Sequence, residues 1–243
     1  MTTSTNETQT PNDGAQEMTK VRGALADGLT LIRALLTPLI MFIILKAWAV
    51  KPHDPQGYVS LDIRLVLLAS VLFALAAFTD ILDDFVGGSA YANARRFGWF
   101  DDISDSVLTN GTLLALVWAL GKAKMLHWSF AAPVLLILGR DIIVGLRRGY
   151  ELSRFGFLES RLGDIKSAIL MLATCLLVAA PWLSGWIDSF RAGSGNVIQV
   201  FGSPSPYVWT TGLVLLWGAA LLALYTGWNI LTTKSETDHK DNA

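Results

Sequence analysis

Four aspartates stand in two pairs at the adjoining ends of two long apolar segments. Asp80 and Asp83 close one segment, and Asp101 and Asp105 open the next. Residues three or four positions apart share one face of a helix, so each pair presents two carboxylates on the same side. Acids are costly at the edge of a bilayer, and four in one place repel each other unless a cation joins them. Carboxylate oxygens suit divalent metals, so the spacing predicts a divalent-cation site.

Apolar segments of membrane-spanning length must position these aspartates. Hydrophobic residues make up 52% of the chain, and a helix needs about 20 of them in a row to cross a bilayer. We therefore predict an all-α integral membrane bundle of about six transmembrane helices. The fourth segment carries Arg140 and Asp141 near its end, so we expect it to leave the membrane there. The segments cover residues 29–50, 61–83, 101–120, 127–145, 165–186 and 207–231.

Polar stretches flank this membrane domain, which we place at residues 21–233. Residues 1–20 are rich in Thr, Asn, Gln and acids. Such a composition buries too little apolar surface to fold, so we predict a disordered tail there and another at residues 234–243. The first tail lacks the basic start and short apolar core of a signal peptide, and its acids are untypical of a mitochondrial transit peptide.

Basic residues gather in alternate loops. The loop between the second and third segments and the loop between the fourth and fifth are the richest in arginine. The positive-inside rule then places both tails and the four aspartates on the cytoplasmic side. The arginines concerned are Arg95, Arg96, Arg147, Arg148, Arg154 and Arg161.

The remaining residues indicate few other chemistries. Cys175 is the single cysteine, so it cannot form an internal disulfide, and it suits a small apolar core position. The three histidines are not spaced as a pair of metal ligands. The chain has no phosphate-binding loop, dinucleotide fingerprint or serine-nucleophile elbow, and we expect no nucleic-acid partner.

The aspartates also match a known signature. The chain resembles the CDP-alcohol phosphatidyltransferase family, whose signature reads D-x2-D-G-x2-A-R-x8-G-x3-D-x3-D. The four acids of that signature fall at offsets 0, 3, 21 and 25, and so do the four of this chain. The other positions differ, since Asp84 and Phe97 replace the two glycines and Gly87 and Gly88 replace the Ala-Arg pair.

Three shorter stretches are similar to the bacterial phosphatidylglycerophosphate synthases of that family. Residues 29–33 read LTLIR, like L-T-x-x-R in their first helix. Residues 140–143 read RDII and residues 163–167 read GDIKS, like their R-E-I-I and G-K-x-K-T. Asp141 is also typical of the cardiolipin synthases of the family.

The resemblance implies an enzyme of phospholipid biosynthesis. Such enzymes transfer a phosphatidyl group from CDP-diacylglycerol to an alcohol and release CMP. The resemblance also implies that Asp80, Asp83, Asp101 and Asp105 hold two Mg²⁺ or Mn²⁺ ions. Asp105 would further serve as the general base that takes the proton of the alcohol.

Cations suit a phosphorylated acceptor, and glycerol 3-phosphate is the acceptor that we expect. Arg140 and Lys166 are the strongest candidates to bind its phosphate, and Arg33 is a weaker one. Arg140 and Lys166 could instead anchor the helices at the headgroups, and Arg33 could pair helices. The remaining substrate-binding candidates occupy signature positions: Asp84, Gly87 and Gly88.

Three alternatives stay open beside this function. One is cardiolipin-synthase-like transfer to phosphatidylglycerol, and a second is a family member that binds without turnover, which the altered signature motivates. The third is a small cation transporter, although a transporter would place its acids nearer the midplane. The similarity to bacterial enzymes implies the bacterial inner membrane with a cytoplasmic active site, and a homodimer is left open.

Overall fold

The structure is a computed structural model that describes most of the chain. The described residues are 13–48, 61–86, 98–152, 161–192 and 206–232. Within them the backbone forms six helices and no strand. Each helix contains an apolar stretch of 18 to 23 residues, which is long enough to cross a bilayer. The predicted all-α bundle of six membrane helices is confirmed, and the protein is an integral membrane protein.

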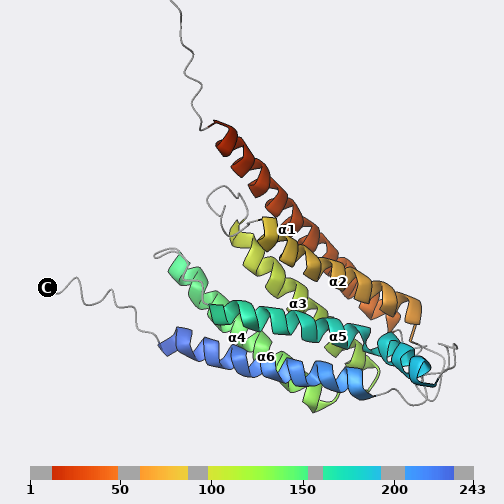
Figure 1. Ribbon diagram of the computed structural model, residues 1–243. Helices are drawn as coiled ribbons and strands as arrows, with labels where there is room; N and C mark the ends of the chain where they lie inside the picture. Colours follow the sequence, from red (N-terminus) through yellow and green to blue (C-terminus); the bar gives the residue numbers. More distant parts are fainter. Residues whose placement is uncertain (1–12, 49–60, 87–97, 153–160, 193–205, 233–243) are drawn as a thin grey trace, which may run out of the picture.

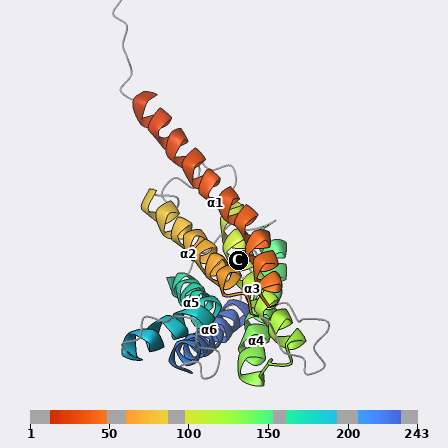
Figure 2. The same ribbon diagram turned by 90° about the vertical axis from the view of Figure 1, so that its right-hand side faces the viewer.

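The helices form two groups that pack against each other (Figure 1 and Figure 2). In one group α1 contacts α2 and α3, and in the other α6 contacts α4 and α5. Contacts of α5 with α2 and α3, and of α3 with α4, join the groups. The bounds are Asp13–Ala47 for α1, Ile63–Val86 for α2, Gly98–Lys122 for α3, Trp128–Leu152 for α4, Arg161–Ala192 for α5 and Pro206–Thr232 for α6.

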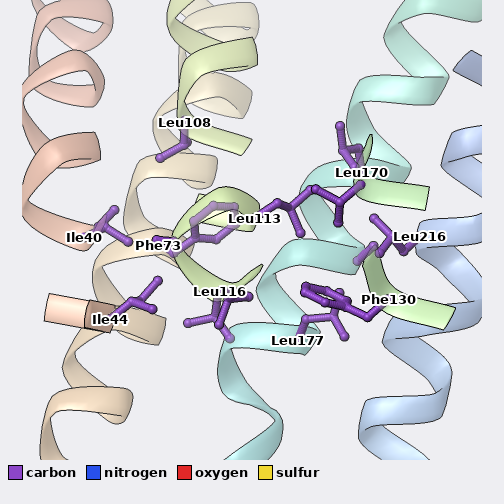
Figure 3. Packing of buried hydrophobic residues seen from close by; sticks show 14 of the residues in the cluster. Ile40, Ile44, Phe73, Leu108, Leu113, Leu116, Phe130, Leu170, Leu177 and Leu216 are labelled. Carbon is purple, nitrogen blue, oxygen red and sulfur yellow. The ribbon is translucent and has the colours of Figure 1, made fainter. Parts of the chain in front are cut away.

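A single apolar cluster fills the space between the helices (Figure 3). Every helix contributes at least one fully buried or nearly fully buried side chain to it. Small residues let the backbones approach closely: a Cβ on Gly212 would lie 2.9 Å from Cγ of Leu177, so α5 and α6 touch there. One representative from each helix, in chain order, is Ile40, Phe73, Leu113, Phe130, Leu177 and Leu216.

The turn between α3 and α4 reverses the chain within a few residues. Lys124 adopts a left-handed φ of 55°. Its N–H donates to the carbonyl of Gly121 at 3.1 Å, and the N–H of Met125 donates to that of Leu120 at 2.9 Å. This pair of bonds is a common way to terminate a helix. The reversal lets α4 run back beside α3.

Helix α1 extends further than predicted. It begins at Asp13, so residues 13–20 are helical and not part of a disordered tail. In Figure 1 and Figure 2 this N-terminal part of α1 projects beyond the other helices. The rest of both predicted tails lies outside the described residues.

Helix α4 also differs from the prediction. It continues past Arg140 and Asp141 to Leu152, and its apolar stretch Trp128–Leu146 includes both charges. The helix therefore does not end at these two residues, and where it leaves the bilayer stays a prediction. The two side chains pair with each other, which reduces the cost of burying them.

Candidate functional site

Arg33 of α1 joins the two predicted aspartate pairs. Its side chain is fully buried, and Nη1 lies 3.2 Å from Oδ1 of Asp80 in α2. Nη1 also forms an ion pair with Asp105 in α3. Nε donates to Oγ1 of Thr79 at 3.5 Å. One member of each aspartate pair is thus brought to the same guanidinium, where three helices meet.

The sequence of α1 explains why a charged side chain can be buried here. Asp27, Thr30, Arg33 and Thr37 are all buried, and they recur at helical spacing along one face of α1. The hydroxyl of Thr37 donates to the carbonyl of Arg33 at 3.0 Å. C-terminal to this polar stretch the same face of α1 becomes apolar, and Ile40 is its first residue in the core. The inward face of α1 is therefore polar toward the aspartates and apolar beyond them.

Asp80 and Asp105 are only partly buried. Their side chains are 29% and 21% exposed, although both contact buried Arg33. The contacts of Arg33 join α1 to α2 and α3, which fits the alternative that Arg33 pairs helices. The weaker prediction that Arg33 binds substrate stays a prediction.

The other predicted ligands lie outside the described side chains. Asp83 and Asp84 fall in the last turn of α2 and Asp101 in the first turn of α3, but their side chains are not described. Gly87 and Gly88 lie outside the described residues altogether. The convergence of all four carboxylates, and the roles of Asp84 and the two glycines, stay predictions.

A second polar cluster surrounds Asp141 of α4. Its Oδ1 lies 2.8 Å from Nη1 of Arg140 and 3.2 Å from Nζ of Lys166 in α5. Its Oδ2 accepts a hydrogen bond from Nδ2 of Asn110 in α3 at 2.9 Å. The side chains of Arg140, Asp141 and Lys166 are only 12%, 13% and 8% exposed, respectively. This neighbourhood brings together the two cations that the sequence selected for phosphate binding.

Arg140 also holds α4 to α6. Nε donates to the carbonyl oxygen of Ala223 at 3.2 Å, and Nη2 donates to Oγ1 of Thr226 at 3.1 Å. Thr226 Oγ1 in turn donates to the carbonyl of Leu222 at 2.9 Å within its own helix. These contacts are with neutral groups, so Asp141 supplies the negative charge of the cluster among the contacts described.

The charge of this cluster suits an anion. Two cations, Arg140 and Lys166, meet at one carboxylate, Asp141, in a mostly buried place. A phosphate could bind such a pair of cations with charge-assisted hydrogen bonds, and arginine binds phosphate well through two donors at once. The alternative that these two cations anchor the helix at the headgroups fits less well, because both are turned inward and paired.

Helix α3 links the two clusters. Asp105 contacts Arg33 of α1, whereas Asn110 contacts Asp141 of α4. Five residues correspond to about 7.5 Å along a helix axis. The acid predicted as general base is thus a short distance along α3 from the cluster that suits a phosphate.

Sequence reasoning missed several of these partners. Asn110 was detectable in principle, because it is an amide inside an otherwise apolar segment. The sequence marks Asp141 as typical of a subfamily and as a charge near the end of the fourth segment, and not as a partner of Arg140 and Lys166. Thr226 and Ala223 carried no signal, since a threonine and an alanine are ordinary in a membrane helix. Their roles depend on which helix lies beside them.

Comparison with known proteins decides the family. The family model for CDP-alcohol phosphatidyltransferases matches residues 23–224. The chain belongs to this family. The family and the enzyme class predicted from the four aspartates are therefore confirmed.

Curated relatives carry one common name. A protein of Rickettsia felis, CDP-diacylglycerol–glycerol-3-phosphate 3-phosphatidyltransferase, is 29% identical over 164 residues, which cover 67% of this chain and 76% of the relative. A protein of the same name from Cereibacter sphaeroides is 30% identical over 178 residues, covering 66% and 78%. A chloroplastic/mitochondrial protein of this name from Arabidopsis thaliana is 27% identical over 131 residues, covering 50% and 44%.

Proposed function

We propose that the protein transfers the phosphatidyl group of CDP-diacylglycerol to glycerol 3-phosphate. The products are phosphatidylglycerophosphate and CMP, so the reaction belongs to phospholipid biosynthesis. The observation that carries the choice of acceptor is the meeting of Arg140 and Lys166 at Asp141, which gathers two phosphate-binding side chains in one mostly buried place. The names of the relatives, which contain both substrates, support the same choice.

The transfer makes and breaks one bond to phosphorus. The hydroxyl oxygen of glycerol 3-phosphate attacks the phosphorus that carries the diacylglycerol. The bond from that phosphorus to the bridging oxygen breaks, and CMP leaves with the electron pair. Asp105 takes the hydroxyl proton, and its partial exposure is compatible with contact to an alcohol. Arg140 and Lys166 hold the acceptor by its phosphate and thereby orient the hydroxyl.

The aspartates supply carboxylate oxygens, which are ligands that divalent metals prefer. Asp80 and Asp105 are hard oxygen donors from two helices that already share a cation, the guanidinium of Arg33. With Asp83 and Asp101 they would hold Mg²⁺ or Mn²⁺, two ions in all. Bound metal would supply charge neutralisation on the diphosphate and its leaving group. Arg33 would keep Asp80 and Asp105 in position.

Metal should stabilise the purified protein. We expect Mg²⁺ or Mn²⁺ to raise the melting temperature, because the cation relieves repulsion among carboxylates. Substituting Asp80→Asn together with Asp101→Asn should abolish this rise, as measured by thermal unfolding in detergent. Asp62→Asn is the matched control, since Asp62 accepts from the backbone N–H groups of Arg64 and Leu65 at the start of α2. Stabilisation that persists in the double variant would contradict the metal site.

The acceptor can be tested by comparing substrates and variants. Purified protein with CDP-diacylglycerol and metal should release CMP when glycerol 3-phosphate is added. We expect Arg140→Ala and Lys166→Ala each to raise the KM for glycerol 3-phosphate by about tenfold or more, since each loses a charge-assisted phosphate contact. The KM for CDP-diacylglycerol should change less. Lys122→Ala, which removes an exposed cation beside Trp118, is the control.

Two results would argue against glycerol 3-phosphate. One is an equal rise in KM for both substrates in the Arg140 and Lys166 variants. The other is CMP release with phosphatidylglycerol and not with glycerol 3-phosphate, which would indicate a cardiolipin-synthase-like reaction. A folded, metal-binding protein that releases no CMP with any alcohol would indicate a member without turnover.

The same proposal includes an orientation in the membrane. The arginine-rich loops favour a cytoplasmic position for both tails and for the aspartates, in a bacterial inner membrane. Tags on the two tails should therefore be accessible from the same side. Cross-linking in native membranes tests whether the protein forms a homodimer.

A further inference from the structure

Arg140 crosses α6 at a glycine. A Cβ built on Gly227 would lie 2.9 Å from Cγ and 3.4 Å from Nε of Arg140. Carbon atoms that are not bonded to each other do not approach so closely in close-packed proteins. Cγ is near the backbone end of the side chain, so it cannot move aside while the guanidinium stays in place. The path of Arg140 across α6 therefore requires a residue without a side chain at position 227.

The contacts of the guanidinium depend on this path. Ala223, Thr226 and Gly227 stand three and four positions apart, so they form one face of α6. The carbonyl of Ala223 accepts from Nε and the hydroxyl of Thr226 accepts from Nη2, while Nη1 reaches Asp141. This face of α6 forms a cradle, Ala223–Thr226–Gly227, in which the guanidinium is held in one orientation.

The cradle leaves part of the guanidinium available. An arginine carries five N–H groups, one on Nε and two on each terminal nitrogen. Among the described residues, Arg140 donates one from Nε, one from Nη1 and one from Nη2. One N–H therefore remains on each terminal nitrogen. N–H groups on the two terminal nitrogens are donors with which arginine binds the oxygens of a phosphate.

We propose that Gly227 is a positioning residue for the acceptor phosphate. Its missing side chain lets Arg140 lie in the cradle with its two remaining donors held for the anion. The inference rests on the proposed function, because it takes the phosphate of glycerol 3-phosphate as the anion. A side chain at position 227 displaces the guanidinium from the place where its remaining donors meet the anion, so binding of the acceptor weakens.

The test compares two glycines of the same helix. Gly227→Ala should raise the KM for glycerol 3-phosphate about tenfold or more, the effect of losing one charged contact. The KM for CDP-diacylglycerol and kcat should change much less, a division that a general loss of folding would not produce. Gly218→Ala is the matched control, because a Cβ there would meet nothing within 4 Å. An unchanged KM for glycerol 3-phosphate in Gly227→Ala would overturn the proposal.

A double substitution tests whether Gly227 acts through Arg140. Arg140→Ala removes the atoms that an added Cβ would meet, so Gly227→Ala should raise the KM no further in that background. Effects that add up in the double variant would show that position 227 acts elsewhere. If Gly227→Ala alone does not fold, Thr226→Val removes the hydroxyl that accepts from Nη2 without filling the path. That variant should raise the KM for glycerol 3-phosphate about threefold, and an unchanged KM would equally overturn the proposal.

Activity of the wild-type protein with glycerol 3-phosphate distinguishes failure of this inference from failure of the proposed function. Wild-type protein that does not use glycerol 3-phosphate would overturn the proposed function. Wild-type protein that uses it, with a Gly227→Ala variant of equal KM, would overturn only the positioning role.

Discussion

Asp105→Asn should abolish nearly all CMP release while the protein stays folded. Asparagine keeps the size and position of the side chain but cannot accept the proton of the alcohol. A general base of this kind contributes about 10²–10⁴-fold in rate. The fold should survive, because Arg33 keeps its ion pair with Asp80 in α2. The measurements are kcat from CMP release, the KM for CDP-diacylglycerol and the melting temperature.

The neighbouring residue provides the control for Asp105. Ser106 is exposed on the next position of α3, so Ser106→Ala should leave kcat close to that of the wild type. The KM for CDP-diacylglycerol should stay similar in Asp105→Asn if the remaining aspartates still bind the metal and the diphosphate. Turnover near the wild-type rate in Asp105→Asn would show that another group takes the proton.

Arg33→Met should greatly reduce the stability of the protein. The substitution keeps an unbranched side chain of similar length but leaves Asp80 and Asp105 close together without their shared cation. Removing one partner of a buried ion pair typically costs about 3–5 kcal/mol. Thermal unfolding in detergent should show this as a lower melting temperature. Lys46→Met, at an exposed cation of the same helix, is the control and should have little effect.

A second substitution and the addition of metal ions identify the cause of the lower stability of Arg33→Met. Asp80→Asn in the Arg33→Met background should recover part of the stability, because it removes the repulsion between the carboxylates of Asp80 and Asp105. Mg²⁺ or Mn²⁺ should also recover part of it if the aspartates bind metal, since the ion replaces the missing cation. Unchanged stability in Arg33→Met, together with a higher KM for glycerol 3-phosphate, would instead return Arg33 to the substrate-binding residues.

The bundle was predictable because the relevant signal is local. The length of each apolar run decides whether a helix can cross a bilayer, and this requires no knowledge of neighbouring helices. The aspartate pairs were visible for a similar reason, since spacing along one helix places Asp80 with Asp83 and Asp101 with Asp105 on common faces. The start of α1 was missed because composition alone assigned residues 13–20 to a tail.

The contacts between helices could not be read from the sequence. Asn110 meets Asp141, and Arg140 meets Ala223, across separations of 31 and 83 residues. Such contacts depend on which helices pack together and on their relative positions along the axis of the bundle. Gly227 illustrates the limit, because a glycine in a membrane helix ordinarily indicates close packing of backbones. The structure shows instead that an arginine side chain occupies the space.

The two polar clusters together fix the positions of all six helices relative to one another along the axis of the bundle. The ion pairs of Arg33 tie α1, α2 and α3, and the contacts around Asp141 and Arg140 tie α3, α4, α5 and α6. Moving one helix by a single residue, about 1.5 Å, would stretch these bonds beyond their normal lengths. When the bilayer is thicker or thinner than the apolar stretches of the helices are long, the whole bundle must therefore tilt or the surrounding lipid must deform. Sliding of an individual helix would break the alignment of Asp105 with Arg140 and Lys166.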